Sequence, residues 1–373
     1  MKAQVIKFLA LVPVAGMMMG NQSCQKQPVV EKRSYKKIVE MGSIQAQPIL
    51  LPGGQSFDFK FVANQQMYGV ITASKKFAMR TAPPIVADPS QATTSNVEDS
   101  RYFNLSKADM GLFQKSLDAN KKSIQSVFSR ESWCMVNLPQ AKISGAINGF
   151  EITGGNGISI GYSPTGASSS FGGAMEFETQ TAQLDLSMRA MPPLGSTVLA
   201  AANIDSKQTK KATKFKLSYA GLSAGMSYFY STPLASVTEN GLTMGLDALA
   251  KQMGDDTWYS RVFADADKAV ILVGGLDVGY KVGDQLDVYN EQYAWDGEPC
   301  NSNYLGGVGT GSSSYYARVE IVSVGDQLSE AKVLQIDPNA TQGFASIGAK
   351  VRLHKLKEDL DKEKAAAATK KAK

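Results

Sequence analysis

The strongest constraint on the fold is a strict alternation of apolar and polar residues in the segment KFKLSYAGLSAGMSYFY, residues 214–230. The alternation changes phase at Ala220-Gly221, so one apolar side precedes this small-residue pair and another follows it. A period of two that is interrupted by such a turn predicts an amphipathic β-hairpin. The apolar side of this hairpin consists of Phe215, Leu217, Tyr219, Leu222, Met226 and Tyr228.

A second alternating segment occupies residues 157–180, where two apolar arms flank a turn-forming SPTGASSS stretch. Its apolar side consists of Ile158, Ile160, Tyr162, Phe171 and Met175. The arms of both hairpins, 157–180 and 210–230, have the length of about nine or ten residues that a tilted strand needs to cross a bilayer. Four strands do not close a barrel, so a spanning role requires a ring of subunits. The alternation by itself favours the alternative, which is a pair of hairpins packed on a soluble sheet.

The N-terminus has the layout of an export signal. Lys2 and Lys7 accompany a short apolar run, and small or polar residues lead to Cys24 in GNQSC. Because the run is too short for a stable bilayer span, residues 1–23 are predicted to be a signal peptide. Bacterial lipoprotein signals end directly before a cysteine that becomes lipidated, so Cys24 is the predicted lipidation site. Plain secretion with Cys24 as an ordinary thiol is the alternative.

The net charge argues against a nucleic-acid partner, and the cysteine spacing argues against a metal site. The formal net charge of +5 comes from the signal segment and the lysine-rich tail, so the body between them is neutral. A neutral body argues against a nucleic-acid partner. Cys134 and Cys300 lie far apart in the sequence and have no metal-ligand spacing, and we expect them to be buried free thiols rather than a disulfide.

The sequence offers no convincing catalytic set. The single histidine, His354, lies at the end of the last predicted strand beside the charged tail, where a surface position is expected. The glycine-rich stretch GGVGTGSSS, residues 306–314, lacks the lysine of a phosphate loop, and no predicted helix follows it. We therefore expect no enzyme activity, no cofactor and no metal site.

The remaining pattern predicts an α+β fold. Residues 24–56 are expected to form a tether and a first strand, and 57–256 an α/β body. In this body, 57–77 is a predicted helix with Ser56 as N-cap and Phe57, Phe61, Tyr68 and Ile71 toward the core. Further helices are predicted from Ser106 and at 232–253, strands at 141–152, and two strands within 178–204 around a Pro-Pro-Leu-Gly turn.

After residue 257 only short strands are predicted, punctuated by Gly-Asp pairs, and they indicate a small all-β barrel or sandwich at 257–354. The six strand segments are WYSRVFAD, DKAVILVGG, QLDVYNE, YYARVEIVSVG, SEAKVLQI and GAKVRLH. Residues 355–373 form a charged Lys/Ala tail.

The ordered series of these elements resembles the curli secretion channel family, the CsgG-like proteins. The resemblance covers residues 57–253 and rests on five segments in this order: ITASKKFAM, SRYFNLSKADMGLFQKSL, LPQAKISGAINGFEI, QLDLSMRAMPPLGSTVLAAANI and STPLASVTENGLTMGLDALAKQM. The following segment, WYSRVFADADKAVILVGGLDVGYKVGDQLDVY, is similar to the C-terminal domain of FlgT-type flagellar ring proteins, which is an SH3-like barrel.

The resemblance implies a lipidated outer-membrane protein whose subunits form a ring and contribute two hairpins each to a shared barrel. Cys24 and the hairpins 157–180 and 210–230 stand at the matching places. The family's constriction loop has no match in LLPGGQSFDF, residues 50–59.

We therefore expect a homo-oligomer on the periplasmic face of the outer membrane, acting in secretion or curli-type assembly and transport, with unidentified envelope or secreted proteins as partners. A periplasmic scaffold of a flagellar or other envelope machine without a pore, and a monomeric periplasmic binding module, are the alternatives.

Overall fold

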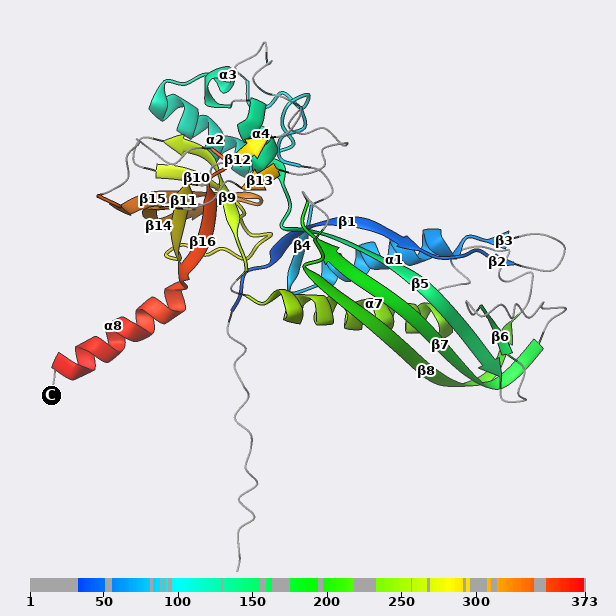
Figure 1. Cartoon of the computed structure of the whole chain (residues 1–373). Coiled ribbons are helices and arrows are strands. Elements are labelled where there is room, and N and C mark those ends of the chain that lie inside the picture. The colour runs from blue at the N-terminus through cyan, green and yellow to red at the C-terminus, as the bar shows by residue number, and fades with distance from the viewer. Residues whose placement is uncertain are drawn as a thin grey trace, which may run out of the picture. The chain divides into compact units, whose positions relative to one another are not determined.

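The structure is a computed structural model. It describes residues 33–50, 56–80, 83–87, 89, 92, 96–128, 130–154, 159–162, 175–193, 197–217, 233–255, 257–266, 269–290, 293–295, 307–309, 314–338 and 347–371. The chain divides into Met1–Arg33 and a compact unit, Ser34–Lys373, which holds every described helix and strand. This unit has an α+β fold, in which a mixed curled sheet with helices precedes a closed six-stranded antiparallel β-barrel (Figure 1). The predicted fold class is confirmed.

The sheet has the strand order β4-β1-β5-β7-β8, and β6 pairs with β5 beside this path. β1 is parallel to both of its neighbours, β4 and β5, whereas the other pairs of this sheet are antiparallel. The strands are β1 Lys37–Gln45, β4 Phe77–Met79, β5 Ala141–Gly154, β6 Ser159–Tyr162, β7 Met175–Met191 and β8 Ala200–Leu217. A separate two-stranded pair consists of β2 Ile49–Leu50 and β3 Ser56–Phe57.

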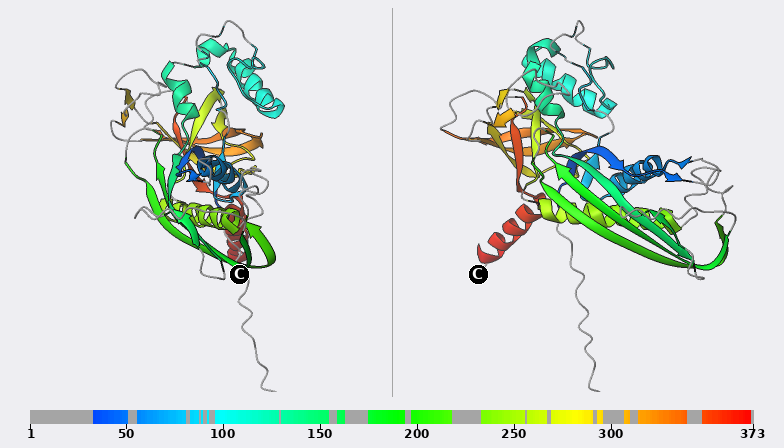
Figure 2. Two further views of the ribbon diagram at one scale, coloured as in Figure 1. Left: turned by 90° about the vertical axis from the view of Figure 1, so that its right-hand side faces the viewer. Right: turned by 45° about the vertical axis from the view of Figure 1, so that its right-hand side comes forward.

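Two helices, α1 Phe59–Ala73 and α7 Pro233–Met253, share one hydrophobic core with this sheet, which curls beside them (Figure 2). The predicted inner side of α1 is wrong in part. Ile71 is buried, but Phe61 is 49% exposed and Tyr68 is 43% exposed. The side of α1 that packs on the core is the one that carries Phe59, Val62 and Met67. The predicted N-cap is also wrong, because Ser56 and Phe57 belong to β3 and Asp58 caps the helix. The buried side of α1 consists of Phe59, Val62, Ala63, Gln66, Met67 and Ile71.

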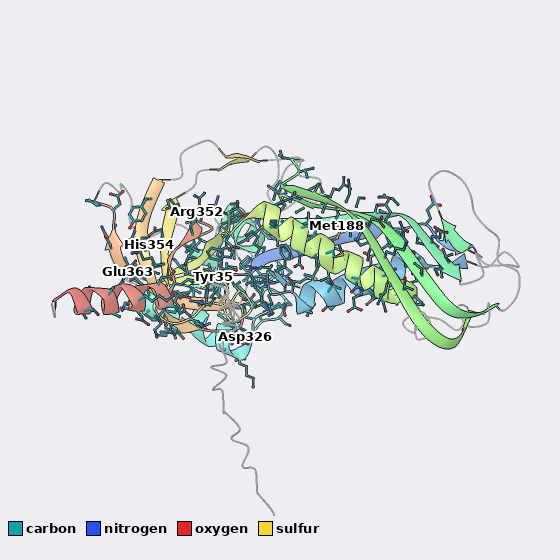
Figure 3. All side chains as sticks on the ribbon, turned by 90° about the horizontal axis from the view of Figure 1, so that it is seen from below. Tyr35, Met188, Asp326, Arg352, His354 and Glu363 are labelled. Carbon is teal, nitrogen blue, oxygen red and sulfur yellow. The ribbon has the colours of Figure 1, made fainter. Side chains whose placement is uncertain are left out.

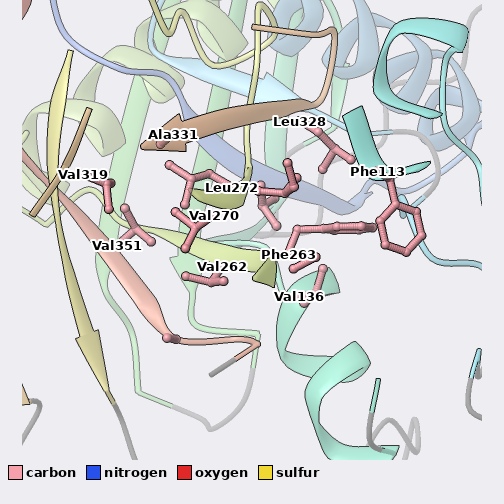
Figure 4. Close-up of a cluster of buried hydrophobic side chains, with 14 of the residues drawn as sticks. Phe113, Val136, Val262, Phe263, Val270, Leu272, Val319, Leu328, Ala331 and Val351 are labelled. Carbon is pink, nitrogen blue, oxygen red and sulfur yellow. The ribbon is translucent and has the colours of Figure 1, made fainter. Parts of the chain in front are cut away.

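A group of shorter helices shares the second core with the barrel. The helices are α2 Lys107–Asn120, α3 Ile124–Val127 and α4 Arg130–Asn137. Ser106 caps α2, as predicted, by accepting a hydrogen bond from the backbone N–H of Asp109. Phe113 of α2 meets the ring of Phe263 edge-on, with 5.1 Å between the ring centroids (Figure 4). Such aromatic pairs add to the energy of burial and fasten these helices to the barrel.

All six predicted strands of the C-terminal part are present, and they close into a barrel in the order β10-β15-β14-β11-β16-β9. They are β9 Ser260–Ala266, β10 Ala269–Val273, β11 Gln285–Asn290, β14 Ser314–Val324, β15 Leu328–Ile336 and β16 Lys350–Lys355. The interior is filled by small and branched side chains such as Val262, Leu272 and Val319 (Figure 4). β12 Tyr293–Trp295 and β13 Gly307–Gly309 form a separate pair, and α8 Lys357–Lys371 follows the barrel.

Three aromatic rings join the start of the folded unit to the barrel. Tyr35 lies 4.7 Å from Trp258 and 4.8 Å from Tyr280, measured between ring centroids. The hydroxyl of Tyr35 donates a hydrogen bond to Asp284 Oδ2 at 2.7 Å. The indole N–H of Trp258 donates to the carbonyl of Lys36 at 3.1 Å. Burial raises the pKa of Tyr280 far above its ordinary value, so its phenol stays protonated.

Two glycines inside helices offer a stability test. A Cβ added at Gly69 in α1 or at Gly111 in α2 would meet no atom within 4 Å. Because glycine loses more backbone entropy in a helix than alanine, Gly69→Ala and Gly111→Ala are each expected to raise the free energy of unfolding by about 0.5–1 kcal/mol. Gly145→Ala is the contrasting variant, since its Cβ would lie 2.5 Å from the carbonyl oxygen of Ser187, and it is expected to destabilise. Urea denaturation measures all three.

Candidate functional site on the long strands

The part of the molecule that the sequence singles out for function is a ribbon of long strands. β7 has 17 residues and β8 has 18, and they pair from Ala190 opposite Ala200 to Met175 opposite Leu217. At about 3.4 Å per residue, each strand spans roughly 60 Å. Strands of globular domains are usually about five or six residues long. The ribbon is therefore much longer than a compact core requires.

One side of this ribbon is apolar where α7 packs on it. On β7 the buried residues recur at every second position: Ala182, Leu184, Leu186, Met188 and Ala190. Two glycines of α7 permit the close approach of the helix, because a Cβ at Gly241 would lie 3.2 Å from Leu184 Cδ2 and a Cβ at Gly245 would collide with Met188 (Figure 3). This side belongs to the core of the sheet.

The opposite side of the same stretch is polar. On β7 it consists of Thr181, Gln183, Asp185, Ser187 and Arg189, and on β8 of Asn203, Asp205, Lys207 and Thr209, next to the exposed Ala201. The hydroxyls of Thr181 and Thr209 are 3.0 Å apart, and the amide of Gln183 donates to Asp205 Oδ2 at 3.3 Å. A sheet with one apolar and one polar side is typical of a domain in water.

In the N-terminal part of β7, from Met175 to Gln180, the two alternating sets of positions exchange their apolar and polar character. The strand itself continues through this stretch. The positions in phase with the buried Leu184 become Gln180, Glu178 and Glu176. The positions in phase with the exposed Asp185 become Thr179, Phe177 and Met175. Because a strand has a period of two, the apolar positions have moved to the other side of the strand.

β8 undergoes the same exchange. Lys214 and Lys216 are in phase with the buried Ser206, whereas Phe215 and Leu217 are in phase with the exposed Asp205. The pairing register shifts at this point: β8 advances four residues, from Lys211 to Phe215, while β7 advances two, from Thr179 to Phe177. Because β8 gains an even number of residues, its odd-numbered positions stay opposite the odd-numbered positions of β7. Phe215 is consequently opposite Phe177, and Lys216 is opposite Glu176.

The sequence-predicted hairpin residues are only partly covered by the structure. Ile160 and Tyr162 lie on β6, where they are opposite Ile152 and Phe150 of β5. The arm 159–162 thus pairs with β5, whereas the sequence predicted that it would pair with 171–180. Met175 pairs with Leu217, and Phe215 lies two positions away on β8. Outside the described residues lie Cys24, Ile158, Phe171, Tyr219, Leu222, Met226 and Tyr228.

Two further sequence predictions concern His354 and the cysteines. His354 Nδ1 lies 3.1 Å from Asp287 Oδ2, so the ring is held by a carboxylate instead of standing free on the surface. Cys134 is disulfide-bonded, which contradicts the expectation of free thiols. Cysteine spacing does not reveal such a bond, because connectivity depends on the fold. Cys300, like Cys24, lies outside the described residues.

Within the described ranges, no cluster of three or more histidine, cysteine, aspartate or glutamate side chains is arranged to hold a metal ion. Among the helices of the same ranges, none combines the length and the apolar character needed to cross a membrane.

Sequence reasoning missed one surface of the barrel. Cation–ring and ring–ring contacts join residues of strands β11, β14 and β16 and the residue before β9: Tyr259, Tyr289, Tyr315, Arg318, Lys350 and Arg352. The alternation of cations in KVRLHK was a signal for it, because Lys350 and Arg352 are two residues apart on one strand. The partner strands are distant in the sequence, so the cluster itself was not visible.

No protein-family model matches the chain, and no curated protein matches it. Among solved structures, one match is the hypothetical protein CT253 from Chlamydia trachomatis, which is 9% identical to this chain. The alignment covers 58% of this chain and 93% of that protein, with a TM-score of 0.23. At this TM-score the likeness carries no argument about function, and it assigns no family.

Proposed function

We propose that the chain is an exported, outer-membrane-associated lipoprotein that self-assembles into a ring, as a CsgG-like secretion channel or as an assembly component. The observation that carries the proposal is the exchange of apolar and polar phases along β7 and β8. Lipidation at Cys24 and the periplasmic side of the outer membrane are parts of the same proposal.

The exchange of apolar and polar positions suits a ribbon that meets the domain core at one end and a different environment at the other. Beside α7 the apolar positions belong to the domain core. Beyond α7 the apolar positions Phe177, Phe215 and Leu217 are in phase with the polar side of the domain. In a ring of subunits, such positions would meet lipid, and the charged positions would line a water-filled lumen. A hairpin that only extends a soluble core has no reason to change sides.

The register supports a wet lumen. Glu176 is directly opposite Lys216, and Gln180 is opposite Lys210. Opposite charges in directly facing positions stabilise an antiparallel pair by roughly 0.2–1 kcal/mol, and they do so next to water rather than next to lipid. The charged phase of the ribbon therefore belongs on the lumen side of the proposed barrel.

The disulfide at Cys134 supports export. Disulfides persist in oxidising compartments such as the bacterial periplasm and are rare in the reducing cytosol. This observation agrees with the predicted signal peptide at 1–23.

A pair of arginine substitutions at neighbouring positions tests the proposal. Leu217→Arg places a charge in the apolar phase and is expected to cost about 2–4 kcal/mol of membrane insertion. Lys216→Arg introduces the same side chain one position away, in the charged phase, and is expected to leave insertion unchanged. Flotation with vesicles and single-channel conductance measure insertion, and circular dichroism checks that both variants fold.

Equal behaviour of the two variants would contradict the lipid-facing assignment. A second result would also overturn the pore: a Cys24→Ala protein that remains soluble and monodisperse without detergent and conducts no ions across a planar bilayer.

A scaffold ring without a pore is the second candidate, and the polar side of β7 and β8 beside α7 favours it, because that stretch is already complete as a soluble sheet. In this case Leu217→Arg leaves the ring intact in negative-stain images. If the chain is instead a monomeric binding module, light scattering is expected to give the mass of a monomer at every concentration.

A further inference from the structure

β8 is an edge strand over the part of its length that belongs to the domain. The sheet ends at β8, and within the described residues no strand pairs with its outer edge (Figure 1). The hairpin predicted at 210–230 begins only after this part, which is 200–209. A strand edge presents backbone N–H and C=O groups that can pair with a further strand. The outer edge of β8 is therefore a surface on which another chain can extend the sheet.

A side chain of α7 shows which backbone groups of β8 point outward. The Oε1 atom of Gln252 accepts a hydrogen bond from the N–H of Ala201 at 3.1 Å, and its Nε2 donates to the C=O of Ala201 at 2.7 Å. The amide of Gln252 thus takes the place of a peptide group in a neighbouring strand. Because successive residues of an antiparallel strand direct their backbone groups to opposite edges, every second residue after Ala201 also points outward. These residues are Asn203, Asp205, Lys207 and Thr209.

The charges beside this edge are unbalanced in a single chain. Asp205 is directly opposite Asp185 of β7, and like charges in facing positions destabilise a pair of strands. The two carboxylates receive hydrogen bonds from uncharged amides, Gln183 to Asp205 at 3.3 Å and Asn148 to Asp185 at 3.4 Å. Lys207 is opposite the uncharged Gln183. Among the described residues, Asp185, Asp205 and Lys207 are exposed and take part in no ion pair. An added strand with a cation beside Asp205 and a carboxylate beside Lys207 would balance both charges.

The same edge of a second copy meets this requirement. Two β8 strands that pair antiparallel about a two-fold axis at Ser206 place Asp205 of each copy opposite Lys207 of the other. In this register Asn203 of each copy is opposite Thr209 of the other. Because all of these facing residues direct their backbone groups outward, the N–H and C=O groups pair in the same register. The edge is thus complementary to itself in charge and in hydrogen bonding.

Exposed apolar surface flanks this edge. Met244 of α7 is 50% exposed. It lies one turn after Asn240, whose side-chain amide donates to Gln208 of β8 at 3.4 Å. Met244 therefore lies on the side of α7 that borders β8, where a second copy would cover it.

We propose that residues 203–209 of β8 pair with the same residues of a second copy in an antiparallel two-fold dimer. The paired strands run in opposite directions, so the hairpin ends of the two copies point away from each other and do not enter one bilayer together. The dimer is a form of the protein outside the membrane. It is separate from the proposed ring and does not depend on it.

The test uses the full chain with Cys24→Ala in buffer without detergent or lipid. Sedimentation velocity is expected to show a monomer–dimer equilibrium that shifts with protein concentration. Asp205→Lys and Lys207→Asp are each expected to raise the dimer dissociation constant by about tenfold or more, because each variant places like charges opposite one another. The double variant restores both charge pairs with reversed signs, and its dissociation constant is expected to return to within about threefold of the parent value.

Arg189→Asp is the matched control, because it reverses a charge on the same polar side but on β7, away from the edge. It is expected to leave dimerisation unchanged. If a charge reversal prevents folding, Asp205→Asn and Lys207→Gln replace it, and each is expected to raise the dissociation constant by about threefold.

Three results would overturn the dimer. They are a protein that stays monomeric up to about 100 µM, an assembly of any size that the single reversals leave intact, and a double variant that does not recover. Because mass is measured without detergent or lipid, the absence of a dimer leaves the ring proposal standing. Equal insertion of Leu217→Arg and Lys216→Arg, in turn, leaves the dimer standing.

Discussion

Replacing Asp284 by alanine is expected to lower the free energy of unfolding by about 3–5 kcal/mol, because its buried carboxylate satisfies donors from three parts of the chain. Asp284 has no exposed surface. It accepts hydrogen bonds from the hydroxyl of Tyr35 at 2.7 Å, the backbone N–H of Lys281 at 2.9 Å and the backbone N–H of Lys357 at 3.0 Å. Urea denaturation of the Cys24→Ala protein, followed by tryptophan fluorescence, measures the loss, since the Trp258 ring contacts Tyr35 at a tilted angle, with 4.7 Å between the ring centroids.

Matched variants separate this network from a general effect of removing a carboxylate. Asp361→Ala, on the exposed side of α8, is expected to change the free energy of unfolding by no more than about 0.5 kcal/mol. Tyr35→Phe removes one hydrogen bond to a charged group and is expected to cost about 1.5–3 kcal/mol. A loss below about 1 kcal/mol for Asp284→Ala would contradict the account, because each orphaned buried donor alone costs that much.

Replacing Asp109 by alanine is expected to cost about 3–5 kcal/mol as well, by detaching α2 from the turn between β14 and β15. The Asp109 carboxylate is fully buried. It accepts from the backbone N–H groups of Gln327 at 3.1 Å and Leu328 at 3.0 Å, and from the hydroxyl of Ser106 at 3.0 Å. The substitution leaves both turn N–H groups without an acceptor. Hydrogen exchange is expected to speed up at Gln327 and Leu328.

Asp326→Ala is the control for Asp109, because it removes a carboxylate from the same turn at an exposed position (Figure 3). It is expected to leave both stability and exchange close to those of the parent protein. If Asp109→Ala and Asp326→Ala behave alike, the hydrogen bonds from the turn do not fasten α2.

The barrel strands were predictable from the sequence because each carries its own local signal. Gly-Asp pairs bound these short alternating runs, as Gly283-Asp284 precedes QLDVYN, and Gly279 and Gly283 adopt the positive φ that such turns require. The turn between β7 and β8 was predictable for the same reason, since a Pro-Pro-Leu-Gly stretch interrupts two alternating runs.

Other features were not predictable, because they depend on residues that are distant in the sequence. Asp109 and Asp284 are ordinary acids in the sequence, and their donors lie more than 200 residues away in Leu328 and Tyr35. The outward position of Phe61 depends on which side of α1 packs against the sheet, and that side is set by Phe59, Val62 and Met67. The disulfide at Cys134 and the pairing of β6 with β5 are likewise products of the tertiary fold.

The sequence predicted which residues of the candidate site alternate, but not which side of the sheet they occupy. The alternation in 210–217 identified the apolar positions Phe215 and Leu217. Only the register with β7 and the burial of Leu184 and Ser206 reveal that these positions are out of phase with the domain core. A single sequence shows each alternating run, but it does not show which phase the helices cover.

The carboxylate of Asp284 has a mechanical consequence, because both ends of the folded unit are fastened to it. Tyr35 at the N-terminal end and the backbone of Lys357 at the start of α8 both donate to this carboxylate, so loads on either end are transmitted to it. Behind Tyr35 the load enters β1, which is hydrogen-bonded in parallel to β4 on one side and to β5 on the other. Pulling along such a strand strains many hydrogen bonds together in shear, instead of opening them one at a time. The parallel pairing of β1 on both sides thus resists tension applied at the N-terminal end of the folded unit.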